Sequence, residues 1–567
     1  LTINTSSAAN TIIGAISGAT SLVNSGSGTL TLSGNNTYTG GTTISAGTVA
    51  LSGSGVLPTS GAVTISGGTL NLGATNLAVS TLTISSGALN SITGYVTGSA
   101  FVINNTLANP IMIGAILQGD GATLTKSGAG ILTLSNTNIY TGSTTISGGT
   151  LAITGTGSIA SSSSILNNAT LDISGTTTGA SIISLNGTSL GVVALGSKIL
   201  TISNGAHTFA GVIQDAGISA GTGGQVIITA GNQVFSGTNT YTGTTTINGG
   251  TLMITNNAGL GANGNGAAGS GTIIASGATL DLYNVIVGNE AITLNGGTLK
   301  DVTSSLAGNI TLGANSTLSA TNADDTLTLS GIISGDYGIT KTGLGTVVLS
   351  NSNNSYTGST TVSAGTLSLS GTGSIASSSN IINNATLDIT STTTGTTITS
   401  LEGNGATFIA GKTLTISNAT NTLSSPYSGS ISGDLGNLVL SAGTQILSGN
   451  NTYTGSTTIN SGTLTVSGLG TLGSTANNLT MSNAAVLDLQ RSLTVGNLVM
   501  ASGNTITNST GSSSLIVGGT ASLAGNITTS GTQTYTGAVT LTGTGATRTL
   551  QGSTITASST IAGGTNA

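Results

Sequence analysis

The chain has 567 residues, a formal net charge of −6, one histidine and no cysteine, and only 4% of its residues are Asp, Glu, Lys or Arg. The seven basic residues are scattered, which excludes the basic patch of a nucleic-acid-binding protein, and the lack of cysteine excludes a disulfide framework or a thiolate metal site. No apolar run reaches the roughly 18 residues of a transmembrane helix. Thr, Val and Ile favour strands, so we expect a hydroxyl-rich exterior that repels itself weakly and works in an assembly or near a surface.

Short alternating strands begin near the N-terminus and recur through the chain. Leu32, Leu51 and Leu72 each end a Leu/Val-x-Leu pattern, so this pattern returns after about 20 residues. Alternation of this kind indicates half-buried strands, and glycines between them supply turns. Such a period fits one coil of a solenoid whose successive strands pair in parallel. We therefore predict an all-β fold, with residues 1–567 forming one continuous β-solenoid of five to six blocks of roughly 100 residues.

A five-residue segment, Asn36-Thr37-Tyr38-Thr39-Gly40, marks each block. One interpretation of its aromatic ring is a row of sugar-stacking platforms, and the other is a ring that seals a turn and bonds through its hydroxyl. We assign these tyrosines as structural repeat residues. The six are Tyr38, Tyr140, Tyr241, Tyr356, Tyr453 and Tyr535.

A second duplication spans two blocks. The segment from Gly157 to Ile173 is nearly copied from Gly373 to Ile389, two blocks further on. We infer that the array grew by copying pairs of blocks.

The run from Leu132 to Leu151, LTLSNTNIYTGSTTISGGTL, resembles the passenger-associated transport repeat of bacterial autotransporters, as do the runs from Leu30, Val348 and Ile446. This resemblance implies a right-handed parallel β-helix that is displayed or released through type V secretion. In that family the repeat is linked to folding and export rather than to catalysis. The segment 540–567 lacks the amphipathic strands of the family's membrane barrel, and the chain starts without Met, so we expect a processed passenger whose barrel is absent or cleaved.

Four aspartates share an Ala-x-Leu-Asp pattern: Asp172, Asp281, Asp388 and Asp488. Paired carboxylates could act as acid and base or bind calcium, but these are about 100 residues apart. We predict outward-facing, solvated aspartates that hinder strand aggregation. The adjacent Asp324 and Asp325 are the one neighbouring acidic pair and form a candidate calcium site.

Other candidate chemistry is sparse. His207 has no second His or Cys for a zinc site, and a catalytic triad would need Ser and Asp neighbours that the sequence cannot locate. The segment from Gly264 to Gly269 matches G-x-G-x-x-G but precedes no helical pattern, so we attribute it to chance. A polysaccharide lyase would need clustered basic and acidic residues, so we predict no enzyme, no cofactor and no metal. The scattered basic residues are Lys126, Lys198, Lys300, Lys341, Lys412, Arg491 and Arg548.

These features predict a non-catalytic extracellular β-solenoid on or released from a bacterial surface. Our first hypothesis is a fibre or sheath subunit or surface stalk that self-assembles end to end or laterally, and thus has itself as partner. The alternative is an adhesin that binds glycans or proteins of a host or sister cell, with its contact in the segment from Ala258 to Asn284, where Tyr283 and Gly/Asn-rich residues interrupt the rhythm. A third hypothesis is ice or surface binding by flat threonine ladders.

Overall fold

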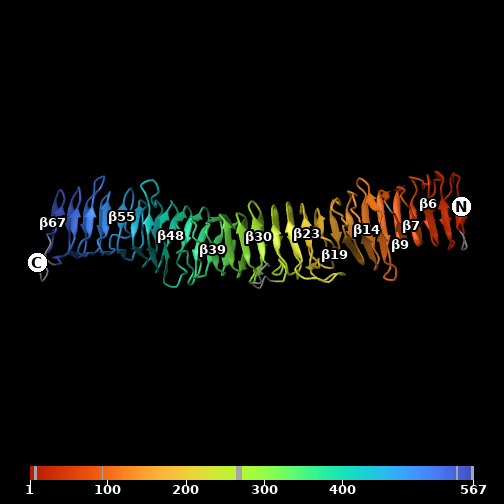
Figure 1. The fold of residues 1–567 in the computed structure, drawn as a ribbon. Helices are drawn as coiled ribbons and strands as arrows, with labels where there is room; N and C mark the ends of the chain where they lie inside the picture. Colours follow the sequence, from red (N-terminus) through yellow and green to blue (C-terminus); the bar gives the residue numbers. More distant parts are fainter. Residues whose placement is uncertain (5–8, 92, 263–270, 544–546, 564–567) are drawn as a thin grey trace. The chain divides into compact units, whose positions relative to one another are not determined.

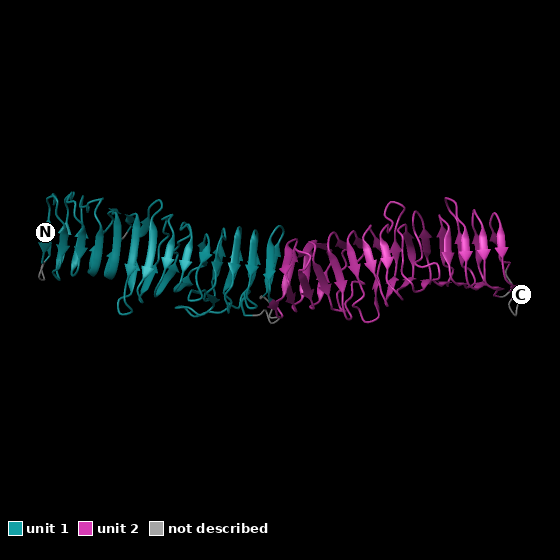
Figure 2. Ribbon diagram, turned by 180° about the vertical axis from the view of Figure 1, so that it is seen from behind, with its two compact units in different colours: residues 1–285 teal, residues 286–567 magenta. Residues whose placement is uncertain are grey.

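The computed structural model describes residues 1–4, 9–91, 93–262, 271–543 and 547–563, and these residues form short strands, turns and bends without a helix. Contacts divide the chain into two compact units, Leu1–Val285 and Ile286–Ala567 (Figures 1 and 2). Each unit by itself is a parallel β-solenoid. The prediction of an all-β solenoid is therefore confirmed.

In the first unit, each strand pairs in parallel with the strand one coil later. Asn24 lies opposite Ile44, and Lys126 lies opposite Ile146, so one coil takes about 20 residues at both places. This confirms the predicted coil length. One continuous ladder consists of β3 (Leu22–Asn24), β5 (Thr42–Ile44), β7 (Val63–Asn71), β9 (Thr81–Asn90), β11 (Ala100–Asn104), β14 (Thr123–Ser127), β16 (Thr144–Ile146) and β18 (Ile165–Asn167).

Two further ladders of the first unit matter for the sites below. One contains β15 (Ile131–Leu134), β17 (Thr150–Gly155), β19 (Thr170–Thr176), β22 (Val192–Ala194) and β25 (Val212–Gln214). The other contains β20 (Gly179–Ile182), β23 (Ile199–Ile202), β26 (Gln225–Ile228), β28 (Thr245–Ile247) and β30 (Thr272–Ala275).

The second unit repeats the arrangement. One ladder contains β38 (Thr326–Leu329), β41 (Thr346–Leu349), β43 (Thr366–Leu369), β45 (Thr386–Asp388), β48 (Ala406–Phe408) and β51 (Ser430–Ser432). The next ladder contains β46 (Gly395–Ile398), β49 (Thr413–Ile416), β52 (Asn437–Leu440), β54 (Thr457–Ile459) and β56 (Leu479–Met481).

The core lies inside the coils, and strand alternation fills it. In β4 (Thr29–Leu32), Leu30 and Leu32 are fully buried, whereas Thr29 and Thr31 face outward and are half-buried. Each aliphatic side chain buried in this way stabilises the fold by about 1.5–3 kcal/mol. The stacking therefore gives every coil a share of a core that one coil could not form alone.

Close backbone approach between coils explains much of the glycine content. Gly47 has φ +58°, and a Cβ built there would lie 2.3 Å from the carbonyl oxygens of both Gly26 and Gly28. No other residue fits without moving the preceding coil. Two expectations stay predictions: that residues 1–567 form one continuous solenoid, and that this solenoid is right-handed.

Candidate functional site

The aromatic ring of the repeated segment lies inside the solenoid. Tyr140 is 1% exposed, and its hydroxyl shares a hydrogen bond with Thr144 Oγ1, four residues on, at 2.7 Å. Burial raises the pKa of the Tyr140 phenol, and the Thr144 hydrogen bond offsets that rise only in part. Four other copies form the same pair: Tyr38–Thr42 (2.5 Å), Tyr241–Thr245 (2.6 Å), Tyr356–Thr360 (2.7 Å) and Tyr453–Thr457 (2.6 Å).

The asparagine of the segment joins three coils. Asn138 Oδ1 accepts a hydrogen bond from Leu117 N in the preceding coil, and Asn138 Nδ2 donates to Ser158 O in the following coil. This side chain therefore satisfies backbone groups on both sides of its own coil. The same pair of bonds recurs at Asn36 (Ile16 N, Val56 O), Asn239 (Ile213 N, Gly259 O), Asn354 (Ile333 N, Ser374 O) and Asn451 (Ile431 N, Thr471 O).

The last two residues of the segment hold the preceding coil. Thr141 Oγ1 accepts a hydrogen bond from Gly121 N at 2.7 Å, and Thr454 Oγ1 accepts one from Leu435 N at 2.8 Å. A Cβ at Gly142 would lie 2.3 Å from Ala122 O, so this position needs glycine. We call the five-residue segment the tyrosine clamp, because its Asn, Tyr, Thr and Gly each have a defined contact.

The sixth copy departs from the clamp. Tyr535 lies within β64 (Gln533–Tyr535), and the residue four positions on is Val539, which has no hydroxyl. The Tyr535 hydroxyl instead donates to Gln533 Oε1 at 3.0 Å. Tyr535 is buried like the others, but its hydrogen bonding is different.

Buried rings do not offer a face to a polymer in solution, so the clamp geometry does not support the sugar-stacking interpretation. The assignment of the six tyrosines as structural residues stays a prediction. The clamp contains no carboxylate, imidazole or amine, so its chemistry is that of hydrogen bonding alone.

The prediction that the four patterned aspartates face outward is wrong for three of them, because Asp172, Asp281 and Asp488 are 2%, 1% and 7% exposed. Asp388 is half-buried. Nearby N–H and O–H donors compensate the burial of Asp172 and Asp488. Asp172 Oδ1 accepts from Ser174 N (2.9 Å) and Ser174 Oγ (2.6 Å).

In the adjacent acidic pair, one aspartate is a local turn cap. Asp324 is exposed, whereas Asp325 Oδ2 accepts hydrogen bonds from Asn322 N (2.7 Å) and Asn322 Nδ2 (3.0 Å) and so closes its own turn. Within the described part of the chain, no three His, Cys, Asp or Glu side chains lie close enough to hold a metal ion.

His207 is exposed, and its Nδ1 shares a hydrogen bond of 2.7 Å with the buried Ser184 Oγ. Ser184 Oγ also accepts from Ala206 N, which marks it as a backbone-satisfying side chain. The G-x-G-x-x-G match from Gly264 to Gly269 lies outside the described residues.

The prediction that the rhythm breaks from Ala258 to Asn284 is wrong for much of that segment. Residues of β30 pair with β28, and β31 (Thr279–Tyr283) pairs with β29 (Thr251–Ile254), so the coil runs on normally there. Residues 263–270, which hold most of the Gly/Asn-rich part of the predicted insertion, lie outside the described residues.

Two fully buried lysines escaped the sequence reasoning. Lys126 Nζ donates to the carbonyl oxygens of Ser127, Gly128 and Gly148 at 2.7–2.9 Å. Lys341 Nζ has the same arrangement with Thr342, Gly343 and Ala364. Burial lowers the pKa of each amine to about 8.

The aligned blocks held a signal for this site. Lys126 lies at the block position that Asn24, Ile228, Lys341 and Leu440 occupy, and the strand pairing confirms the equivalence. When one block position holds Lys in some copies and an aliphatic residue in others, its side chain is expected to point into the core. The lysine amine then reaches carbonyl groups at the edge of the core.

Comparison with known proteins agrees with this structure. The family model described as the passenger-associated-transport-repeat matches residues 22–51, 124–153, 230–254, 339–369 and 440–466, which contain the first five clamps but not the sixth copy. The adhesin BmaC autotransporter of Brucella suis biovar 1 (strain 1330) is 31% identical over 493 residues, which is 82% of this chain and 13% of the relative. No solved structure matches the chain.

The chain therefore belongs to the bacterial autotransporter passengers that carry passenger-associated transport repeats. Such passengers are exposed on the cell surface or secreted. In the described residues, no helix has the length and apolar character that crossing a membrane requires.

Proposed function

We propose that this chain is a non-catalytic surface stalk within a larger autotransporter passenger. The supporting observation is the tyrosine clamp, which ties each marked coil to the coil before and the coil after it by side-chain hydrogen bonds. Bonds between neighbouring coils resist extension along a solenoid. The chain spans 13% of the length of the related adhesin, which suits a segment that carries a binding part away from the cell.

Negative-stain microscopy of the purified chain tests this proposal. Coils of about 20 residues at a spacing of about 4.8 Å would give unbranched rods on the order of 130 Å long. Separate globular lobes joined by flexible linkers would contradict it. Replacing the clamp residues Asn138 and Tyr140 by alanine together should shorten or bend the rods, whereas replacing the exposed neighbour Ile139 should not.

Self-assembly into a fibre or sheath is the second candidate. It is supported by a surface with few charges, because only 4% of residues are charged and such surfaces repel one another weakly. Sedimentation velocity over a hundredfold concentration range should show growth into larger species at neutral pH. A single monomer boundary at every concentration would remove this candidate.

The third candidate is adhesion to glycans or proteins of a host or sister cell, and it is supported by the relative that is described as an adhesin. Purified chain added to a suspension of the bacterium and its target cells should compete for the receptor and reduce adherence. If adherence is unchanged at a saturating concentration of the purified chain, adhesion is excluded and the stalk proposal stands.

A further inference from the structure

The two copies of the duplicated segment differ in what covers one aspartate. In the first unit Asp172 pairs across to Ala194 in the next coil. In the second unit the equivalent Asp388 pairs across to Phe408. The copies otherwise share the sequence Ala-Thr-Leu-Asp-Ile at this strand, so the difference lies in the neighbouring coils.

In the first unit, the protein's own chain covers the aspartate. The connection from β25 to β26 takes ten residues, 215–224, and folds back over Asp172. Ile218 N donates to Asp172 Oδ2 at 2.6 Å, and Ser219 N donates to Ser174 Oγ at 2.9 Å. As a result Asp172 is 2% exposed and Ala194 is also 2% exposed.

In the second unit, the equivalent connection is only four residues, 433–436, between β51 and β52. The aspartate face therefore stays open. Phe408 is 41% exposed, and the side chains on either side of it, Asp388 and Ser432, are half-buried. Asp388 Oδ1 accepts from Thr390 N at 2.8 Å, and Oδ2 accepts no hydrogen bond from the residues that the structure describes.

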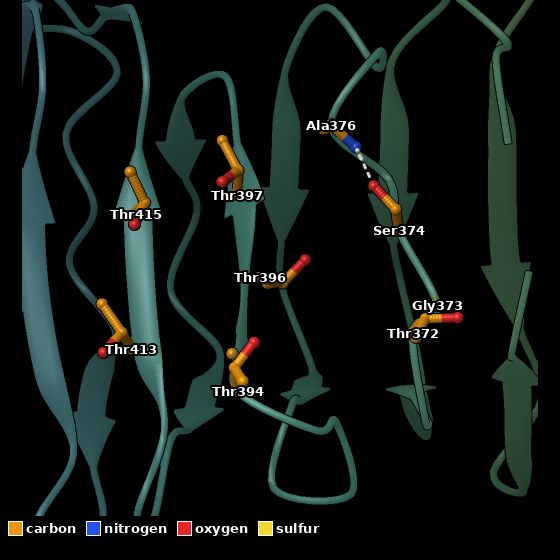
Figure 3. Close-up of a pocket in the computed structure, with 10 residues that line it drawn as sticks. Thr372, Gly373, Ser374, Ala376, Thr394, Thr396, Thr397, Thr413 and Thr415 are labelled. Carbon is orange, nitrogen blue, oxygen red and sulfur yellow. Dashed lines mark hydrogen bonds between the residues drawn. The ribbon is translucent and has the colours of Figure 1, made fainter. Parts of the chain in front are cut away.

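A hydroxyl-lined groove of about 360 Å³ lies at the start of the next strand along the chain after each of these two residues, at β46 after Asp388 and at β49 after Phe408 (Figure 3). It is lined by Thr396 and Thr397 of β46 and by Thr413 of β49, which begins five residues after Phe408. None of these three hydroxyls hydrogen-bonds to a described residue.

The first unit has different side chains at three of the positions that line this groove. Strand register places Ala180, Ser181 and Ile199 where the second unit has Thr396, Thr397 and Thr413. The hydroxyls of Thr396 and Thr413 and the open aromatic ring are therefore missing from the first copy, whereas Ser181 keeps a hydroxyl at the position of Thr397.

We propose that this corner, formed by Asp388, Phe408 and the threonine groove, binds a neutral oligosaccharide. An exposed ring presents a negative π-face to the C–H groups of a sugar ring. Asp388 Oδ2 is an acceptor for sugar hydroxyls, and the threonine hydroxyls both donate and accept. Lys412, directly before Thr413, already donates to Thr393 O, and the Asp388 carboxylate repels anionic sugars, so the site favours an uncharged ligand. The proposal rests on adhesion as a function of the chain and names the ligand class and the site.

The test is binding of the whole chain to immobilised gluco-, galacto- and manno-oligosaccharides, with sialylated and sulfated oligosaccharides in parallel and titration of the best ligand by calorimetry. We expect at least one neutral series to bind and the anionic series to bind at least tenfold more weakly. Phe408→Ala should weaken binding at least tenfold, and this variant should fold because Ala194 occupies the same position in the first unit. Asp388→Asn should weaken it severalfold while keeping the Thr390 hydrogen bond.

Tyr337→Ala is the matched control, because Tyr337 is 45% exposed in the same unit but lies outside the corner; its affinity should stay within twofold of wild type. The proposal is overturned if no neutral oligosaccharide binds at 10 mM, if Phe408→Ala binds like wild type, or if only anionic sugars bind. Should the chain still reduce adherence to cells stripped of glycans, adhesion would stand and the sugar site would fall.

Discussion

At the scale of single residues, buried polar side chains hold the coils in register. A dry core gives attraction without direction, whereas an amide or hydroxyl inside it must find partners at fixed positions. Asn138, Tyr140 and Lys126 each find theirs on the backbone or side chains of the same or a neighbouring coil. These residues therefore fix how one coil sits on the next.

Removing the hydroxyl of a clamp tyrosine should lower the free energy of unfolding. The size of the loss should depend on whether the partner threonine has a second hydrogen-bond partner. Tyr140→Phe leaves Thr144 with Ser162 as a second partner at 2.9 Å, so we expect a loss of about 0.5–1 kcal/mol. Tyr38→Phe leaves the buried Thr42 hydroxyl without another side-chain partner among the described residues, so we expect about 1–2 kcal/mol. Urea unfolding followed by circular dichroism measures both, with Ile139→Ala as the surface control. Equal losses at the two sites would contradict this account.

The buried lysines should make stability rise with pH. Burial lowers the pKa of Lys126 and Lys341 to about 8, from an ordinary 10.5. Between these values the unfolded chain binds a proton that the folded chain does not, so the free energy of unfolding increases from about pH 8 upward. The buried tyrosines act in the opposite sense above about pH 10, because burial raises their pKa.

Urea midpoints between pH 7 and about 9.5 measure this effect. Lys126→Leu, which copies Leu440, should raise stability at pH 7 and reduce the slope of the urea midpoint against pH. Adding Lys341→Leu should remove most of the remaining slope. Lys412→Leu, at an exposed amine, is the control. A slope that is unchanged in the double variant would disprove the assignment.

At the scale of elements, turns decide which residues a block can accept. Leu435 has φ +56° and is 73% exposed, whereas the corresponding turns of other blocks place Gly121 and Gly223 at this position. A left-handed conformation costs a non-glycine residue about 1–2 kcal/mol.

Leu435→Gly should therefore stabilise the chain by about 0.5–1 kcal/mol, the gain being reduced by the flexibility of glycine in the unfolded chain. Thermal unfolding measures it. Leu469→Gly is the matched control, because Leu469 is also exposed but has no positive φ, and that change should be neutral or destabilising. Destabilisation by Leu435→Gly would contradict this explanation.

At the scale of the whole molecule, solubility depends on very few charges. The chain carries 13 acidic and 7 basic residues and has an isoelectric point near 4.3. Near that pH the net charge vanishes, and a hydroxyl surface with few charges has little left to keep copies apart.

We expect reversible association as the pH falls from 7 toward about 4.3, measured by light scattering. Thr31→Glu with Thr133→Glu, at outward strand positions, should suppress it at pH 5 and above. Thr→Ser changes at the same two positions are the control. Constant scattering from pH 7 to 4 would refute the expectation.

The sequence by itself determined the parallel coils, their length and the passenger family, because a short hydrophobic rhythm and a long repeated motif are local patterns that survive without coordinates. It also located Tyr140 and its equivalents, but it could not show that Asp172 is buried while Asp388 is half-open. That difference depends on which segment covers each strand, 215–224 in one unit and 433–436 in the other. Whether a polar group is buried depends on whether a connecting segment of another coil covers it, and only the tertiary structure shows where that segment lies.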